Sequence, residues 1–390
     1  MKALVLSGGG AKGSYQIGVW KALRELNIHF DIITGTSSGA LNGALMTQNS
    51  YHKAKVLWKK INNRVLFGDN AVESTNNIDV YKMYAKEFLK RGGMDVQELE
   101  TIIKGAINVD KLYNSKIKFG LVTYNLTKKK VYELSKDEID KDKMADYLMA
   151  SATCYPAFQK KDIEGLEFID GGYYDNLPIS LAQKLGADEI IAVDLRAPGI
   201  KRHVKTKANN IIYIRPNNKL TSFLNFYKEG AKKNIAFGYN DTLKVFNKLE
   251  GKRFTFRKGE LALNSKKYIE TYTYVVQEII NSNRLINDFK KLNKLPNIDT
   301  DSIKEILFND IMQSTGHHLN LDETKIYKAK SYNKKIKKIV TDSIKKNNIT
   351  KEIEYYLMIK EGNYKELRKK IFINPRDVLR AIYIYSLFEN

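Results

Sequence analysis

The first fifty residues alternate short apolar runs with glycine-rich turns, and this alternation constrains the fold more than any other feature of the chain. The run A-L-V-L at 3–6 enters the glycine loop S-G-G-G-A-K-G at 7–13, and F-D-I-I-T at 30–34 enters the turn G-T-S-S-G at 35–39. Apolar residues at helical spacing follow each turn. A strand–helix–strand–helix order with short turns predicts a parallel α/β sheet.

The rest of the chain continues this pattern to about residue 250 and then changes. Further strands are expected within 116–134, before Asp170, at 189–195 and at 210–214, and helices at 51–112, 143–152, from 178 and at 222–248. Residues 251–390 have a helical, lysine-rich pattern without a glycine motif. The sequence therefore predicts an α/β domain with a mostly parallel central sheet over 1–250 and a mainly α-helical region over 251–390.

The glycine loop has two interpretations, a dinucleotide site or an oxyanion hole. Gly8, Gly10 and Gly13 form a G-x-G-x-x-G pattern between a strand and a helix, the context of dinucleotide-binding loops. In such folds an acid ends the second strand, whereas Asp31 begins it. Consecutive glycines before a helix also expose backbone N–H groups that stabilise an oxyanion. The oxyanion interpretation also explains the second turn, because parallel strands bring both turns to one edge.

The turn at 35–39 has the G-x-S-x-G form of a nucleophile elbow. In that turn a sharp strand-to-helix bend presents the hydroxyl of the central serine, and small flanking residues prevent clashes. By this spacing Ser37 is the candidate nucleophile, with Gly35 and Gly39 on either side. Ser38 occupies the x position, and we expect it to begin the helix.

The proton acceptor for this serine is expected to be a carboxylate. The chain has five histidines, His29, His52, His203, His317 and His318. None of them follows a strand in a glycine-rich turn. Asp170 does, in F-I-D-G-G, and a carboxylate held against the serine hydroxyl in a partly dry cleft can act as a base. Asp175 is the rival, but it precedes Asn176 and Pro178, where an acid commonly caps a helix.

Three motifs in this order resemble the patatin-like phospholipase family: S-G-G-G-A-K-G at 7–13, G-T-S-S-G at 35–39 and D-G-G at 170–172. The stretch A-S-A-T-C-Y-P-A-F at 150–158 resembles the family segment that lines the site. The resemblance covers about residues 1–250. Two departures are Ser7, where many members carry aspartate, and the proline of 150–158, which stands one residue later than usual.

The resemblance implies a patatin-like three-layer α/β/α fold and a Ser–Asp dyad without histidine. It assigns Ser37 as nucleophile and Asp170 as base, with Gly171 and Gly172 supporting the turn. The implied oxyanion hole consists of Gly8, Gly9, Gly10, Lys12 and Gly13. Lys12 stands where the family has a basic residue that orients the loop or meets a phosphate. No cofactor and no metal is implied, and no His, Cys or carboxylate cluster with metal-ligand spacing is visible.

The resemblance also implies the reaction and the substrate class. Ser37 would attack a fatty-acyl ester to give an acyl-enzyme, which water activated through Asp170 would hydrolyse, and phospholipids are the leading substrates. The alternative is a non-catalytic lipid- or nucleotide-binding module on the same fold.

Charge and composition bear on partners and location. The net charge of +22 favours peripheral contact with an anionic membrane surface, although abundant Lys, Asn and Ile are also the bias of an AT-rich genome. No aromatic-basic motif supports a nucleic-acid partner. The single cysteine, Cys154, excludes an internal disulfide. Without a signal-peptide pattern or an apolar run of about 18 residues, we expect a cytoplasmic, peripherally membrane-associated protein, with signal-less export left open.

The C-terminal region carries its densest basic stretch at 325–351. Ile336, Ile339, Val340 and Ile344 could form an apolar stripe among the lysines. One interpretation is an amphipathic segment that lies on lipid or covers the mouth of the site. The other is a helix packed into the body of the protein with solvated lysines.

Overall fold

The computed structural model describes residues 1–68, 71–72, 74–202, 211–279 and 300–390. The chain divides into two compact units, Met1–Val245 (unit 1) and Phe246–Asn390 (unit 2); the boundary expected from the sequence was near residue 250. Residue 210, the first residue of the strand expected at 210–214, lies outside the described residues.

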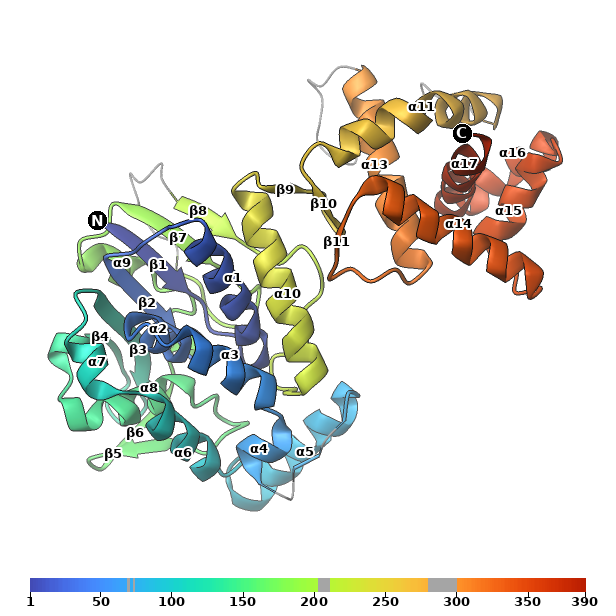
Figure 1. Ribbon diagram of the computed structural model, residues 1–390. Helices are drawn as coiled ribbons and strands as arrows, with labels where there is room; N and C mark the ends of the chain where they lie inside the picture. The colour runs from blue at the N-terminus through green and yellow to red at the C-terminus, as the bar shows by residue number, and fades with distance from the viewer. Residues whose placement is uncertain (69–70, 73, 203–210, 280–299) are drawn as a thin grey trace. The chain divides into compact units, whose positions relative to one another are not determined.

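Unit 1 contains an eight-stranded sheet (Figure 1). Its strands are β1 (Lys2–Leu6), β2 (Ile32–Thr36), β3 (Lys118–Asn125), β4 (Lys130–Ser135), β5 (Lys161–Ile163), β6 (Leu166–Asp170), β7 (Glu189–Val193) and β8 (Ile211–Ile214). The order is β5-β6-β3-β2-β1-β7-β8, with β4 also paired to β3. The strands from β3 through β2, β1 and β7 to β8 are parallel, while β4, β5 and β6 join by antiparallel pairing.

The helices of unit 1 cover both faces of this sheet. They are α1 (Ser14–Glu25), α2 (Ser38–Thr47), α3 (Tyr51–Lys60), α4 (Asn63–Phe67), α5 (Asn77–Arg91), α6 (Gln97–Ala106), α7 (Val109–Tyr113), α8 (Met144–Ala152), α9 (Ile179–Lys184) and α10 (Lys228–Val245). Short 3-10 turns lie at Gly10–Gly13, Lys136–Glu138, Lys141–Lys143 and Gly171–Tyr173. In Figure 1, α10 runs alongside α1, and the two helices pack on each other.

Alternation along the strands explains the two helical layers, because successive side chains point to opposite faces of a sheet. Ala3 and Val5 of β1 join one core cluster with Ile179 and Ala182 of α9. Leu6 of β1 points the other way and lies against α2. The predicted three-layer α/β/α class with a mostly parallel sheet is confirmed.

Unit 2 is mainly helical, as expected, and has a hydrophobic core of its own. Its helices are α11 (Glu260–Ile279), α13 (Thr300–His318), α14 (Ala329–Lys345), α15 (Lys351–Lys360), α16 (Tyr364–Ile373) and α17 (Pro375–Glu389). The sequence did not predict its small sheet of β9 (Leu249–Glu250), β10 (Thr255–Arg257) and β11 (Ile326–Tyr327). Ile336 and Val340 of α14 are fully buried in this core, whereas Ile344 is exposed.

The described helices include none with the length and apolar character needed to span a bilayer.

Candidate active site

The glycine loop and the serine turn lie at the same edge of the sheet, where β1 and β2 end. The two strands are parallel, and Leu6 pairs with Gly35. β2 continues to Thr36, beyond the end expected at Gly35, because Thr36 still pairs with Val122 of β3. The chain therefore leaves both strands at nearly the same height, and residues 7–13 face residues 37–39.

Tight packing explains why glycine occupies the loop. A Cβ at Gly8 would lie 2.3 Å from Asn176 Oδ1, and a Cβ at Gly9 would lie 2.8 Å from Leu195 Cδ1. Gly10 has φ 51°, and a Cβ there would lie 2.1 Å from the Phe223 carbonyl oxygen. Any side chain at these positions would displace the loop from the sheet edge.

Some amides of the glycine loop donate hydrogen bonds within the protein, and others lie at the cavity. The Gly8 amide donates to the Asn176 carbonyl (3.1 Å), and the Lys12 amide donates to the Gly9 carbonyl (3.0 Å). Gly9 and Gly10 line the cavity above Ser37, and their amides donate no hydrogen bond within the described part of the chain. Of the five residues expected in the oxyanion hole, these two are the ones placed to meet a ligand.

Gly13 and Lys12 have other contacts. A Cβ at Gly13 would lie 2.8 Å from the Ser38 side chain, so Gly13 allows α1 and α2 to begin side by side. The Lys12 ammonium donates to the Arg196 carbonyl (3.2 Å). Burial and the nearby Lys201 lower the pKa of Lys12. Neither residue lines the cavity.

Ser37 sits on a strained bend between β2 and α2. Its backbone has φ 57° and ψ −130°, a conformation that a residue with a side chain rarely adopts. A Cβ at Gly35 would lie 2.4 Å from the Gly39 backbone, and one at Gly39 would lie 2.3 Å from the Leu6 carbonyl oxygen. The two glycines thus allow α2 to turn back directly over the strand.

Ser151, in the last turn of α8, holds the bend at Ser37 by a hydrogen bond. The Ser37 amide donates to Ser151 Oγ (2.9 Å), and Ser151 Oγ donates to the Val122 carbonyl (2.7 Å). All of these groups are buried. The bond holds the backbone of the strained residue, so that its side chain is left to face the cavity.

Asp170 reaches the site on a strand that runs against its neighbour. β6 is antiparallel to β3, and Asp170 pairs with Thr123, one residue beyond the Val122 that pairs with Thr36. Asp170 was expected at the carboxyl end of a strand, in the glycine-rich turn that follows it. The structure brings it to that height from the opposite direction, because the β3–β4 hairpin extends past the ends of β1 and β2.

Asp170 is held through both its side chain and its backbone. The Gly172 amide donates to Oδ1 (2.7 Å), and the Ser37 hydroxyl lies beside the carboxylate and favours its charged form. The Asp170 amide donates to the Thr153 carbonyl (2.8 Å). A Cβ at Gly171 would lie 2.1 Å from the Val122 carbonyl oxygen, so only glycine allows this turn after β6.

Burial changes the acidity of Asp170. Removal from water disfavours the charged form and raises the pKa to about 6, although hydrogen bonds from Ser37 and Gly172 oppose this rise. The carboxylate is therefore mostly ionised at neutral pH but is a stronger base than an exposed aspartate. A pKa near the working pH suits a group that accepts a proton and returns it.

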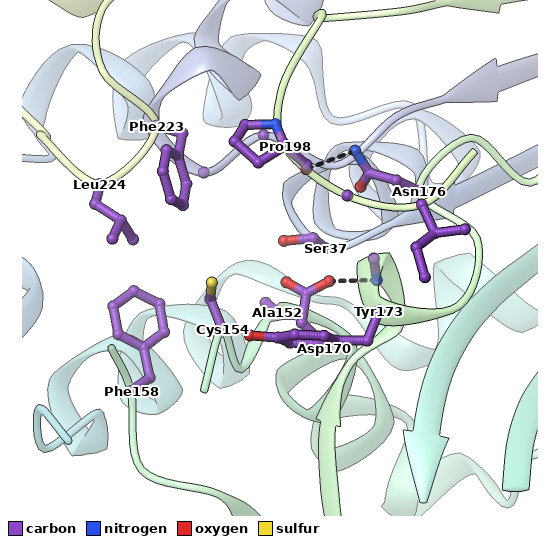
Figure 2. A pocket seen from close by; sticks show the side chains of 15 residues that line it. Ser37, Ala152, Cys154, Phe158, Asp170, Tyr173, Asn176, Pro198, Phe223 and Leu224 are labelled. Atoms are coloured by element: carbon purple, nitrogen blue, oxygen red, sulfur yellow. Dashed lines mark hydrogen bonds between the residues drawn. The ribbon is translucent and has the colours of Figure 1, made fainter. Parts of the chain in front are cut away.

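A cavity of about 340 Å³ opens above the Ser37–Asp170 pair. Figure 2 shows both side chains facing this space, with Phe158, Leu224 and Phe223 on one side. Among the described residues, the lining consists of Gly9, Gly10, Ser37, Ala152, Cys154, Phe158, Asp170, Gly172, Tyr173, Asn176, Pro198, Gly199, Ile200, Phe223 and Leu224. Its walls are mainly apolar, and its few polar groups gather at the serine end.

Sequence reasoning missed two residues that shape the site, Ser151 and Asn176. Asn176 Nδ2 donates to the Pro198 carbonyl (3.2 Å), and its own carbonyl holds the Gly8 amide. Ser151 lies in the stretch 150–158, which resembles the family segment that lines the site, and Asn176 directly follows Asp175. Their polar side chains among small or apolar neighbours were the available signal.

The rival residues have other surroundings. The Asp175 carboxylate accepts from the Leu177 amide (3.1 Å) and lies against Ser180 Oγ, and it does not line the cavity. Ser38 begins α2, and its hydroxyl is buried without a hydrogen-bond partner. Asp31 Oδ2 accepts from the Lys2 amide (2.8 Å) at the opposite edge of the sheet, where a nucleotide at the glycine loop would not meet it.

The four histidines in the described part of the chain do not take part in the arrangement. None of His29, His52, His317 and His318 lines the cavity, and His203 lies outside the described residues. The groups that meet at the serine are a carboxylate and backbone amides.

Part of the chain matches a known protein family and relatives of known name. Residues 4–182 match the model of a family described as patatin-like phospholipase, a span that includes Ser37 and Asp170. A lysophospholipase nte1 from Aspergillus terreus is 32% identical over 197 residues, which is 49% of this chain and 12% of that protein. Patatin-like phospholipase domain-containing protein 7 from Rattus norvegicus is 28% identical over 194 residues, 50% of this chain and 13% of that protein. The chain thus spans about an eighth of these relatives.

Among solved structures, VipD from Legionella pneumophila is similar at 16% sequence identity with a TM-score of 0.42. The match covers 99% of this chain and 90% of that one.

Proposed function

Because residues 4–182 belong to the patatin-like phospholipase family, we propose that the chain is a serine acyl hydrolase that cleaves fatty-acyl esters of phospholipids. The observation that carries the proposal is the placement of the Ser37 hydroxyl, on its strained bend, beside the buried carboxylate of Asp170 at one cavity. Holding Ser37 in a strained backbone conformation costs folding stability. Such strain is typical of residues at functional sites.

The first half of the reaction forms an acyl-enzyme. Asp170 accepts the proton of the Ser37 hydroxyl while the oxygen attacks the ester carbonyl carbon. The amides of Gly9 and Gly10 donate to the oxyanion, which is typically worth a few kcal/mol per donor. As the tetrahedral intermediate collapses, the proton on Asp170 passes to the leaving alcohol, and the acyl group remains on Ser37.

The second half returns the enzyme to its starting state. Water enters where the alcohol left and loses a proton to Asp170 as its oxygen attacks the acyl-enzyme. The same two amides hold the second oxyanion. The proton then returns to Ser37 Oγ as the fatty acid departs, so one water is consumed per ester and no other reactant is needed.

The shape of the cavity supports a lipid substrate. The side away from Ser37 is bounded by Phe158, Phe223 and Leu224, which suit an acyl chain, and the polar groups sit at the reacting end. The relatives named lysophospholipase favour a phospholipid or lysophospholipid ester.

Substitution of the two adjacent serines tests the proposal. Ser37→Ala should abolish hydrolysis of lysophospholipid and short-chain ester substrates and the labelling by a fluorophosphonate probe. Ser38→Ala should keep most of both, because Ser38 does not line the cavity. Circular dichroism checks that both variants fold. A folded wild type that neither turns over nor labels would favour the non-catalytic binding module, and loss of activity only in Ser38→Ala would contradict the assignment of Ser37.

We further propose that α5 meets the membrane near the cavity. Ile78 and Leu89 of α5 are large apolar side chains that are 62% and 86% exposed. The same helix contacts the cavity wall, since the Tyr84 hydroxyl donates to the Leu224 carbonyl (2.9 Å). Exposed apolar groups next to lysines are typical of helices that lie in a bilayer interface, and α5 carries Lys82, Lys86 and Lys90.

A further inference from the structure

Three helix ends meet in unit 2, far from the candidate active site in sequence. His318 closes α13, Glu352 stands in the first turn of α15, and Asp377 stands in the first turn of α17. Helix α17 packs against both α13 and α15 (Figure 1). The potential ligand atoms of these three side chains all lie within 4.8 Å of one another.

Glu352 gives an independent reason to examine this cluster. Its side chain is only 1% exposed, and both carboxylate oxygens are buried without a hydrogen-bond partner in the described structure. His318 Nε2 lies 3.1 Å from Oε2, but this contact does not have hydrogen-bond geometry. The Thr350 hydroxyl, at the start of the same helix, is also buried and unpartnered. A buried carboxylate without partners is costly, so such groups are normally paired or bound to a metal.

We propose that His318, Glu352 and Asp377 bind a divalent metal ion, with Zn²⁺ the best fit. One imidazole nitrogen and two carboxylates form a mixed nitrogen and oxygen set that suits Zn²⁺, whereas Mg²⁺ and Ca²⁺ prefer oxygen ligands alone. Two carboxylates balance the charge of the ion. Three protein ligands leave a fourth tetrahedral position for water.

The surroundings of the cluster set the geometry of the third ligand. Asp377 Oδ1 accepts from Arg380 Nη1 (2.9 Å), and Arg380 Nε donates to Ser314 Oγ (3.0 Å). Asp377 therefore offers Oδ2 to the ion, and Arg380 orients the carboxylate as an outer partner. His318 is 42% exposed, which gives the ion a path from solvent.

The metal would join three helices that are separated by long stretches of sequence. Binding to the folded state alone raises stability by mass action. The site is thus a structural element of unit 2, and it does not depend on the proposed hydrolysis. The sequence did not reveal this site, because the three ligands lie 34 and 25 positions apart and form no short motif.

Metal binding to the full chain tests the proposal. The protein is stripped with a chelator and titrated with Zn²⁺ in competition with a chromophoric indicator, while the thermal midpoint is followed. We expect about one tight equivalent per chain and a higher midpoint. His318→Gln and Glu352→Gln should each weaken binding at least tenfold, and Co²⁺ should give visible bands that His318→Gln alters.

The adjacent histidine provides the matched control. His317 Nδ1 faces Glu323 Oε1 (2.6 Å), outside the cluster, so His317→Gln should bind Zn²⁺ as the wild type does. Glu352→Gln preserves size, and its midpoint without metal shows whether it folds. No tight equivalent in the wild type, or equal weakening by His317→Gln, would overturn the site. The cluster would then be a His318–Glu352 ion pair, whose loss lowers the midpoint regardless of Zn²⁺.

Discussion

At the scale of single residues, Ser37 and Asp170 are held in states that neither would adopt alone. Ser37 is confined to a backbone conformation with positive φ, and Asp170 is buried away from bulk solvent. Each constraint comes from neighbours that fit closely, such as Gly39 against Leu6 and Gly171 against Val122. The chemistry of the pair is thus set by packing around it.

The raised pKa of Asp170 predicts how activity depends on pH. The base must be ionised, so kcat/KM should fall about tenfold per pH unit below about pH 6 and level off above it. Because the folded pKa exceeds that of an unfolded chain, protonation of Asp170 favours the folded state, and the loss should occur without unfolding. Initial rates on a neutral ester, with circular dichroism at each pH, check this.

Asp175 supplies the control for that profile. Burial also raises the pKa of Asp175 to about 6. Its carboxylate, however, accepts a hydrogen bond from the Leu177 amide and does not line the cavity. Asp175→Asn should keep the acid limb of the profile in place. If the acid limb vanished in this variant while the protein stayed folded, the limb would come from Asp175 and not from Asp170.

At the scale of elements, the crossing of α1 and α10 supports the glycine loop that precedes α1. The two helices touch through glycines: a Cβ at Gly18 would lie 1.9 Å from the Ile235 carbonyl oxygen, and one at Gly238 would lie 1.9 Å from the Tyr15 carbonyl oxygen. The Tyr15 hydroxyl also donates to Asp241 Oδ2 (3.1 Å). The start of α1, and with it the glycine loop, is fixed by this contact.

Gly18→Ala should therefore destabilise the protein although alanine favours helices. The added methyl group meets backbone rather than a movable side chain, and overpacking of this kind costs about 1–3 kcal/mol or more. Urea unfolding followed by circular dichroism measures the loss. Gly105→Ala, in α6 where a Cβ meets nothing within 4 Å, should instead stabilise by about 0.5–1 kcal/mol. Equal effects of the two changes would contradict the role of the crossing.

At the scale of the whole molecule, two units with separate cores share a net charge of +22. Charge draws a protein to an anionic surface, but exposed apolar side chains decide which face is inserted. In unit 1 the exposed apolar groups Ile78 and Leu89 belong to α5, the helix whose Tyr84 hydroxyl donates to the cavity-lining Leu224. In unit 2, two residues of the apolar stripe that the sequence predicted, Ile336 and Val340 of α14, are buried in the core and are not available to a membrane.

Vesicle binding should therefore depend on both salt and α5. The full chain should sediment with phosphatidylserine-containing vesicles more than with pure phosphatidylcholine vesicles. Binding should weaken from about 0.1 M to about 1 M salt, as the screening length falls from about 10 Å to about 3 Å. The double change Ile78→Glu and Leu89→Glu should reduce binding further.

Phe372→Glu is the matched control, because Phe372 in α16 is 75% exposed but belongs to unit 2. It should leave vesicle binding close to that of the wild type. If it alone abolishes binding, the membrane surface lies in unit 2. Equal binding to vesicles and to DNA, with the same salt dependence, would point to unspecific attraction by charge.

The sequence by itself determined the local features: the order of strands and helices in the first fifty residues, both glycine turns, and the resemblance to the family whose model matches residues 4–182. These features depend on residues that are close in the chain, such as Gly35, Ser37 and Gly39, so local sterics suffice to predict them. Only the tertiary structure decided the antiparallel approach of β6, the hold of Ser151 on Ser37, and the meeting of His318, Glu352 and Asp377. Each of these depends on strand register or helix packing between distant segments, which hydrophobic patterns leave open because many registers bury the same side chains.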